Sequence, residues 1–373
     1  MNLSFWERQT WLHEIDYALV GSGIVGLNCA LALRKQHPNA KIVIFERGIL
    51  PSGASTKNAG FACFGSVSEM LDDLNSHSEE EVIELVKERV SGLQLLRNTL
   101  GDTTIDYQCH GGYEVFLKKD ATLFEQCKHQ MPYINELMQE VFEDKEPIFS
   151  LKKDDFGFQN THDQLLFNRL EGQLDTGKMM RALLKKASEN DILILNSCEV
   201  TQLQPAEGTL TINDTETLQP KKICIATNGF AKQLLSEEVK PARAQVLITK
   251  PIPNLSIKGT FHLDKGYYYF RNIGDRLLFG GGRNLDFQGE ETTEMVLTET
   301  IQQQLEQLLK HTILPEIPFE IEQRWSGIMG VGDQKKPILK QIAPTVFCGV
   351  RLGGMGVAIG SAVGKKLAAL TLS

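Results

Sequence analysis

The strongest constraint on the fold lies close to the N-terminus of the chain. An apolar run at residues 17–20 predicts a buried strand, and it leads directly into a glycine-rich turn at residues 21–26. Residues 27–34 are apolar at helical spacing, and a second apolar run at residues 42–45 ends on Glu46. Strand, glycine turn, helix and second strand predict a βαβ unit with an acidic residue at the tip of its second strand.

Each part of this unit suits the binding of a dinucleotide. Gly21 permits a tight turn, Gly23 lets the backbone approach a pyrophosphate, and Gly26 lets the helix lie close to the sheet. The N–H groups and the positive dipole end of the helix N-terminus favour phosphates. Glu46 would accept the ribose hydroxyls and disfavours a 2′-phosphorylated nucleotide, which an arginine suits better. The unit alone leaves FAD and NAD both open.

Composition and charge narrow the class of protein. The 373 residues are enough for two domains with separate cores, and the hydrophobic content of 42% is ordinary for a globular chain. The net charge of −8 disfavours nucleic acid as a partner, because phosphate contacts need a basic face. No apolar run is long enough to span a bilayer, and the first residues lack the layout of a signal peptide. We therefore expect a cytoplasmic protein without an integral membrane segment.

The seven cysteines are scattered along the chain and form no CxxC pair. Cys29, Cys224 and Cys348 stand in apolar contexts, which predicts buried thiols. This spacing predicts neither a disulfide framework nor a zinc site, so we expect no metal in the functional site.

Beyond the βαβ unit, the pattern predicts that the chain leaves the first sheet twice and rejoins it twice. The C-terminal return is a strand at residues 346–350, a glycine loop at 351–356 and an apolar helix to Leu372, so that a second helix N-terminus can point at a ligand. Residues 272–275 predict a hairpin turn. The other expected elements are helices at about residues 76–98, 121–141, 178–189 and 294–311, and strands at about 112–117, 163–167, 192–195, 198–201, 221–226, 245–249, 266–271 and 276–280.

The order of these motifs resembles the FAD-dependent D-amino-acid oxidase/glycine oxidase superfamily, the DAO family. The resemblance extends over almost the whole chain and favours FAD over NAD. Besides the glycine turn and Glu46, the segments that carry it are residues 53–61, 226–229, 241–246, 269–271, 324–327 and 351–356.

The resemblance implies an α/β fold, α+β overall, in which a Rossmann-like FAD-binding domain is interleaved with a sheet-rich substrate domain. The FAD-binding domain would comprise residues 1–75, 171–235 and 325–373. The substrate domain would comprise residues 76–170 and 236–324, and the isoalloxazine ring would lie between the two.

It also implies that FAD is bound non-covalently, since the cysteine that tethers flavin in one branch of the family has no counterpart here. Val200 would touch the adenine, and the loop before the last helix would lie under the pyrimidine end of the ring, where the helix dipole stabilises negative charge on reduced flavin. The residues expected to hold FAD are Gly21, Gly23, Ile24, Val25, Gly26, Glu46, Arg47, Ala54, Ser55, Lys57, Asn58, Ala59, Gly60, Phe61, Val200, Asn228, Gly353, Gly354, Met355, Gly356 and Val357.

Two departures from the family pattern leave the substrate open. Amino-acid oxidases of the family carry an arginine, a bidentate clamp for the substrate carboxylate, shortly after the Trp-Ser/Ala-Gly motif, where this chain has Ile328 and Met329. The lysine of the sarcosine-oxidase-like branch is replaced by residues 357–359. Arg271 is our candidate for a substitute anchor, with a solvent-exposed arginine at a hairpin end as the alternative.

Other candidates come from the same strands. Tyr269 and Trp325 complete the predicted catalytic set, and strand alternation places Tyr269 and Tyr268 on opposite faces. His262 shows no partner in the sequence, and we identify no His–carboxylate pair. Lys265 could activate oxygen beside the flavin, but residues 264–266 are typical of a turn, and we favour the turn.

The sequence therefore predicts an FAD-dependent oxidoreductase that oxidises a C–N bond of a small-molecule amino acid or amine by hydride transfer. Oxygen would reoxidise the flavin, or a quinone or electron-acceptor protein would do so in an amine dehydrogenase. The alternative from another class is a non-catalytic or redox-sensing flavoprotein.

Overall fold

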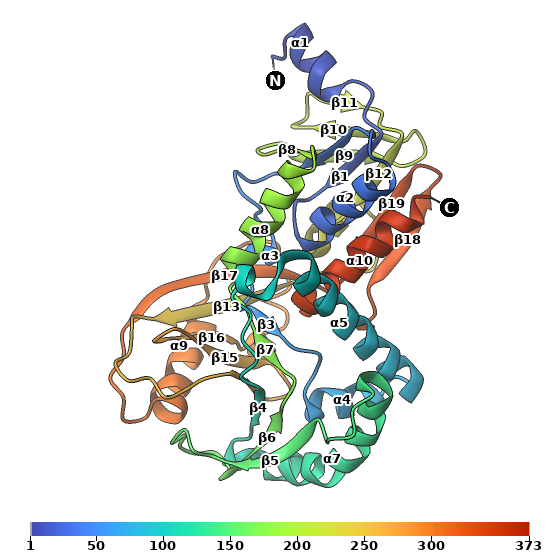
Figure 1. Cartoon of the computed structure of the whole chain (residues 1–373). Helices are drawn as coiled ribbons and strands as arrows, with labels where there is room; N and C mark the ends of the chain where they lie inside the picture. Colours follow the sequence, from blue (N-terminus) through green and yellow to red (C-terminus); the bar gives the residue numbers. More distant parts are fainter. Residues whose placement is uncertain (1, 373) are drawn as a thin grey trace.

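Two sheets at opposite ends of the molecule organise the computed structural model, which describes residues 2–372 (Figure 1). The chain crosses between the two sheets several times, so each sheet contains strands from distant parts of the sequence. The model confirms the mixed α/β fold that the sequence predicts.

The first sheet has six strands in the order β18-β19-β12-β1-β2-β8, all parallel except β18. All residues of β1 and β2 are buried, as expected for parallel strands that are covered on both faces. The strands are β1 (Tyr17–Val20), β2 (Ile42–Phe45), β8 (Leu193–Leu195), β12 (Lys222–Ile225), β18 (Ile338–Ala343) and β19 (Val346–Val350).

Helices cover one face of this sheet and a small sheet covers the other. The helices α2 (Ile24–Gln36), α8 (Thr176–Glu189) and α10 (Gly356–Leu370) share a hydrophobic core with alternate residues of β1 and β2. The small sheet, β9 (Val200–Gln204), β10 (Thr209–Ile212) and β11 (Glu216–Leu218), packs on the remaining residues of the same strands. The apolar face of α2 explains the helical periodicity seen in the sequence.

The second sheet has eight strands in the order β17-β13-β16-β15-β14-β4-β6-β5. One face packs a cluster of phenylalanines, including Phe261, Phe270 and Phe279, beneath α9 (Glu299–Leu308). The other face is turned toward the first sheet. The strands are β4 (Gly112–Val115), β5 (Phe149–Lys153), β6 (Gln164–Asn168), β13 (Lys240–Thr249), β14 (Thr260–Leu263), β15 (Tyr268–Ile273), β16 (Arg276–Gly281) and β17 (Ile321–Val331).

Three helices pack on the β5–β6 end of this sheet, namely α4 (Val67–Leu74), α5 (Glu79–Leu100) and α7 (Ala121–Phe142). The shorter elements are α1 (Phe5–Glu7), η1 (Arg8–Leu12), α3 (Ala54–Lys57), β3 (Phe61–Ala62), α6 (Asp102–Ile105), η2 (Lys118–Asp120), β7 (Gly172–Gln173), η3 (Asn228–Gln233), η4 (Arg283–Leu285) and η5 (Leu309–Ile313). No described helix combines the length and the apolar character that crossing a membrane requires.

Most predicted elements are confirmed, including the β15–β16 hairpin, whose register pairs Ile273 with Arg276. The helix expected from residue 294 begins later, at Glu299. Its delay has a physical cause, because the N–H of Thr298 donates to Gln245 Oε1 at 3.0 Å and keeps Thr298 extended. The three cysteines predicted to be buried are buried and free. The domain boundaries stay a prediction.

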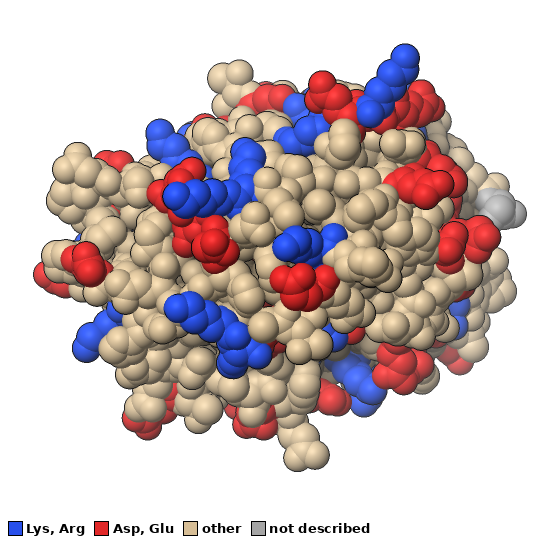
Figure 2. Space-filling model, turned by 90° about the horizontal axis from the view of Figure 1, so that it is seen from below, with Lys and Arg blue, Asp and Glu red and all other residues tan. Residues whose placement is uncertain are grey.

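Charged side chains of both signs are interspersed on the face of the molecule seen from below (Figure 2). This face does not carry the continuous basic surface that a phosphate backbone would need.

A buried ion pair fastens the segment before α9 to the second sheet. Arg243 on β13 donates from Nε and Nη2 to the two carboxylate oxygens of Glu290, at 2.9 and 2.7 Å. The two side chains are only 4% and 2% exposed. Gln245 Nε2 donates to the same carboxylate at 3.0 Å. The pair therefore lies in a region where an unpaired charge is strongly destabilising.

We predict that Arg243→Met lowers the free energy of unfolding by about 3–5 kcal/mol, because Glu290 is left buried without its cation. Urea unfolding followed by circular dichroism measures the change. Lys240→Met is the matched control, since the Lys240–Asp333 pair on the same strand is exposed and should contribute at most about 1 kcal/mol. Equal losses in the two variants would contradict the prediction.

Candidate functional site

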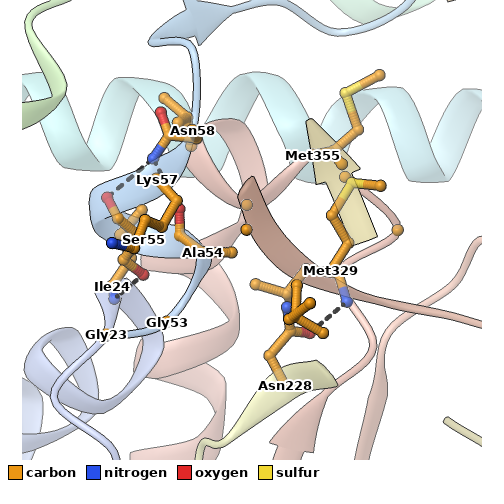
Figure 3. A pocket seen from close by; sticks show the side chains of 18 of the residues that line it. Gly23, Ile24, Gly53, Ala54, Ser55, Lys57, Asn58, Asn228, Met329 and Met355 are labelled. Carbon is orange, nitrogen blue, oxygen red and sulfur yellow. Dashed lines mark hydrogen bonds between the residues drawn. The ribbon is translucent and has the colours of Figure 1, made fainter. Parts of the chain in front are cut away.

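A cavity of about 400 Å³ extends from the glycine turn after β1 to the inner face of the second sheet. Its walls come from both sheets and from the loops between them. Figure 3 shows Ser55 and Lys57 of α3, together with its C-cap Asn58, on one side of the cavity. Asn228, Met329 and Met355 lie on the other side. All the residues predicted to hold the cofactor line this cavity except Gly26.

The glycine turn brings α2 into close contact with the end of β1. Gly21 has a φ of +102°, and α2 begins at Ile24 with Gly23 as its N-cap. A Cβ at Gly26 would lie 2.0 Å from the carbonyl oxygen of Gly21, so only glycine permits this packing. Gly26 therefore acts behind the cavity wall, while the first turn of α2 faces the cavity.

Glu46 is held rigidly at the tip of β2. Its Oε2 accepts hydrogen bonds from the N–H and hydroxyl of Ser22 at 3.1 and 2.8 Å. Its Oε1 accepts from the N–H of Gly48 and the hydroxyl of Ser52, both at 2.9 Å. The carboxylate is 5% exposed and lines the cavity. The hydroxyl donors can rotate, which leaves the carboxylate able to accept from a ligand.

The end of the cavity beyond Glu46 is partly aromatic. The guanidinium of Arg47 lies 3.7 Å from the ring centroid of Phe230, and Val200 lines the same end. Such a surface suits a planar heterocycle.

The loop that contains α3 is held from both sides. Ser55 Oγ accepts from the N–H of Ile24 at 3.0 Å, and Asn58 Oδ1 accepts from the N–H of Gly60 at 2.9 Å. Trp325 Nε1 donates to the carbonyl of Lys57 at 2.9 Å. These bonds fix the backbone that lines the cavity.

The loop before α10 forms the facing wall. Gly353 and Gly354 both have positive φ values, +60° and +85°, and α10 begins at Gly356. The N–H of Leu352 donates to Asn228 Oδ1 at 3.1 Å. Asn228 thereby joins η3 to this loop, and the N-terminus of α10 faces the cavity.

A row of polar and aromatic side chains crosses the second sheet next to the loop that contains α3. In register, His262 on β14 pairs with Glu114 on β4 and with Tyr269 on β15. Phe61 lies edge-on to both rings, with centroids 5.3 Å from His262 and 5.6 Å from Tyr269. Gly280 leaves the room that the Tyr269 ring occupies.

Tyrosine alternation on β15 follows the prediction. Tyr267 and Tyr269 line the cavity, whereas Tyr268 packs in the core on the opposite face. Burial raises the pKa of Tyr269 to about 12. Its hydroxyl therefore keeps its proton at neutral pH.

Arg271 and Trp325 do not line the large cavity. Both line a smaller cavity of about 210 Å³ on the other side of the α3 loop. Arg271 donates from Nε to the carbonyl of Ala59, from Nη2 to that of Leu174 at 2.9 Å and from Nη1 to that of Asn272 at 3.2 Å.

The solvent-exposed alternative for Arg271 is wrong, because the side chain is 5% exposed, and burial lowers its pKa to about 10. Of the three predicted catalytic residues, only Tyr269 lies in the large cavity.

The expectation that no His–carboxylate pair exists is also wrong. His262 Nε2 lies 2.5 Å from Glu171 Oε1, and the two side chains are 7% and 1% exposed. Burial opposes the charge of His262, but Glu171, Glu69 and Glu114 outweigh it and raise the pKa of His262 to about 9. Burial raises the pKa of Glu114 to about 7, against the hydrogen bonds from Ser68.

No local pattern in the sequence points to this pair, since the two residues are 91 positions apart. The one available signal was a histidine between apolar residues of a short strand, which marks a polar side chain on one face. Among the described residues, no group of three or more histidine, cysteine or acidic side chains is arranged to hold a metal ion.

A protein-family model described as FAD dependent oxidoreductase (DAO) matches residues 16–370 of the chain. The chain belongs to this family. The predicted FAD-dependent oxidoreductase class is therefore confirmed, as is the resemblance on which it depended. No curated protein matches the chain in sequence.

Solved structures of DAO-type enzymes share the fold. Glycine oxidase from Geobacillus kaustophilus is 19% identical, with a TM-score of 0.76 and coverage of 96% of this chain and 95% of that chain. Iminodiacetate oxidase from Chelativorans sp. BNC1 is 17% identical, with a TM-score of 0.74 and 95% coverage of both chains. L-proline dehydrogenase from P. horikoshii is 16% identical, with a TM-score of 0.71 and coverage of 96% and 93%. At these identities the similarity shows the fold.

We predict that Gly26→Ala reduces both stability and FAD content, because the new Cβ would overlap the Gly21 carbonyl and push α2 away from β1. Overpacking of this kind costs about 1–3 kcal/mol. Thermal unfolding and the flavin-to-protein absorbance ratio measure the two effects. Gly177→Ala in the first turn of α8, where the nearest atom is the Asp175 carboxylate oxygen at 3.3 Å, should leave the flavin content unchanged and should not lower the stability. Full flavin content in Gly26→Ala would contradict the prediction.

Proposed function

We propose that this chain oxidises the carbon–nitrogen bond of an amino acid or amine, with hydride passing from the substrate carbon to non-covalently bound FAD. One observation carries the proposal. A single cavity joins a dinucleotide cradle to a chamber walled by His262, Phe61 and Tyr269. A dinucleotide site alone would also suit a flavoprotein without turnover, but the chamber gives a small substrate a place beside the cofactor.

The cavity walls fit FAD along its length. The first turn of α2 offers N–H groups to the pyrophosphate, and Glu46 offers a carboxylate to the ribose. Val200 and the Arg47–Phe230 stack would contact the adenine. The backbone of the α3 loop and the loop before α10 would flank the ring. FAD, when bound, supplies the hydride acceptor.

The protein's own contribution is alignment, exclusion of water and placement of protons. Amine oxidation by hydride loss requires a neutral amine held close to the acceptor, within about 3–3.5 Å. Phe61, Val246 and Met329 make the chamber largely apolar. Tyr269 retains its hydroxyl proton and can donate it in a hydrogen bond to a substrate oxygen.

Arg271 and Trp325 are proposed as positioning residues for this chemistry. Their side chains donate to the carbonyls of Ala59 and Lys57, which belong to the loop that lines the cavity. Loosening either contact would shift the backbone that flanks the flavin. The carboxylate-anchor role predicted for Arg271 would need its guanidinium to release these carbonyls.

FAD should be released when the protein is denatured, because no cysteine stands at the position of the flavin tether. The purified protein should be yellow, and acid precipitation should leave the flavin in the supernatant. Absorbance of the supernatant and the pellet measures the partition. Flavin retained in the pellet would mean a covalent bond.

Anaerobic mixing with a panel of amino acids and primary and secondary amines tests the reaction. We expect at least one class to bleach the flavin absorbance, and the α-deuterated compound to bleach it several-fold more slowly, since the C–H bond breaks in that step. Readmission of air then separates an oxidase, which recovers its colour rapidly, from a dehydrogenase that needs a quinone or an acceptor protein. If no compound bleaches a fully loaded protein, the non-catalytic or redox-sensing class replaces this proposal.

A further inference from the structure

His262 presents a hydrogen-bond donor to the chamber while its other side is fully occupied. Nε2 is bonded to Glu171 Oε1, and Glu171 Oε1 also accepts from the hydroxyl of Thr260 at 2.8 Å. Nδ1 has no hydrogen-bond partner among the described residues, and it is not one of the polar atoms sealed from solvent. A protonated imidazole donates from both nitrogens, so Nδ1–H is available to a ligand in the cavity.

The groups around His262 keep the ring charged. Glu171 lies behind it, Glu114 is its neighbour on β4, and Glu69 reaches it from α4. The carboxylates have other donors, since Glu69 Oε2 accepts from the N–H of Ser66 at 2.9 Å and Glu114 accepts from the hydroxyl of Ser66 at 3.2 Å. The exposed positive end of the cluster is therefore the Nδ1–H of His262.

Three other cations that line this cavity, Lys265, Lys335 and Arg283, have partners of their own. Lys265 pairs with Asp72 at 2.7 Å, and its side chain is 39% exposed. Lys335 pairs with Asp73. Arg283 lies over the ring of Phe287, 5.0 Å from its centroid. His262 is more deeply buried than any of these, so a negative charge beside it would be screened less by water.

Ile328 and Met329 supply no cation from the facing strand β17. We infer that Nδ1–H of His262 binds a carboxylate oxygen of the substrate, with Glu171 holding the ring in orientation; this rests on the function proposed above. Tyr269, which faces the same row of the sheet, is placed to share the same carboxylate. The ligand class is a small monocarboxylate, and an uncharged amide of the same shape should bind much more weakly.

The test measures acetate binding to the FAD-loaded protein through the change in flavin absorbance. Acetate keeps its charge from pH 7 to 10, so any loss of binding in that range belongs to the protein. Affinity should fall up to about tenfold per pH unit above about pH 9, where the His262 ring loses its proton. Ionisation of Glu114, whose pKa is about 7, should cause only a smaller decrease at lower pH. Acetamide should bind weakly and without this pH dependence.

Two substitutions test whether the acetate binding and its pH dependence arise from His262. His262→Gln removes the charge but keeps an N–H group, and it should weaken acetate binding about 10-fold or more and abolish the pH dependence. Glu171→Gln removes a carboxylate that raises the pKa of His262, so the pH at which acetate binding is lost should move downward. His162→Gln is the matched control, since His162 stacks on Phe124 outside the cavity.

Unchanged acetate affinity in His262→Gln, or binding that persists equally at pH 10 in the unsubstituted protein, would overturn the inference. If the variants do not fold, the comparison of acetate with acetamide across pH in the unsubstituted protein still decides it. The readout requires no turnover. Acetate binding with the expected pH dependence, but without flavin bleaching by any amino acid or amine, would refute only the proposed reaction. Flavin bleaching without this acetate binding would refute only the role of His262 as the carboxylate anchor.

Discussion

The site depends on one clamped segment, residues 53–61, which touches both sheets. From α2, which packs on the first sheet, the N–H of Ile24 donates to Ser55; from the second sheet, Trp325 and Arg271 donate to carbonyls of the same segment. Buried hydrogen bonds are costly to break, above all the one from the charged Arg271, so these contacts make the segment a rigid partition between the large and the small cavity. The size and shape of the large cavity follow from where this partition lies.

Electrostatics divide the large cavity into two parts with different properties. At the end near the glycine turn, helix N-termini and the fixed carboxylate of Glu46 would complement the phosphates and ribose hydroxyls of the proposed cofactor. At the chamber end, burial sharpens the interaction between His262 and the surrounding carboxylates, because little water screens them. The same low-dielectric surroundings keep Tyr269 protonated. The chamber is thus equipped with hydrogen-bond donors, one of them charged.

The sequence brings together residues that line one end of the large cavity, because its signals there are local. The glycine turn, the residues of the α3 loop and the strand–glycine loop–α10 unit each fall within a dozen or so consecutive residues, and the backbone geometry they require restricts the residue types. Strand alternation likewise predicts that Tyr268 and Tyr269 of β15 point to opposite faces of the sheet. These features follow from short-range rules, so they can be read before the fold is known.

The chamber end could not be predicted in the same way. Strand alternation places Arg271 and Tyr269 on the same face of the second sheet. Packing between the two sheets decides on which side of the α3 loop each side chain lies, and Arg271 lies on the side of the small cavity. The pairing of His262 with Glu171 depends on the neighbouring positions of β14 and the β6–β7 connection, which are distant in the chain. Contacts of this kind arise from tertiary structure and leave no local pattern.

The most direct test of this account is a crystal structure of the FAD-loaded protein with acetate. The account predicts that the flavin ring lies between residues 59–61 and the loop before α10, and that the acetate carboxylate is within hydrogen-bonding distance of His262 Nδ1. Flavin bound elsewhere, or acetate bound to Arg271 on the other side of the α3 loop, would contradict it.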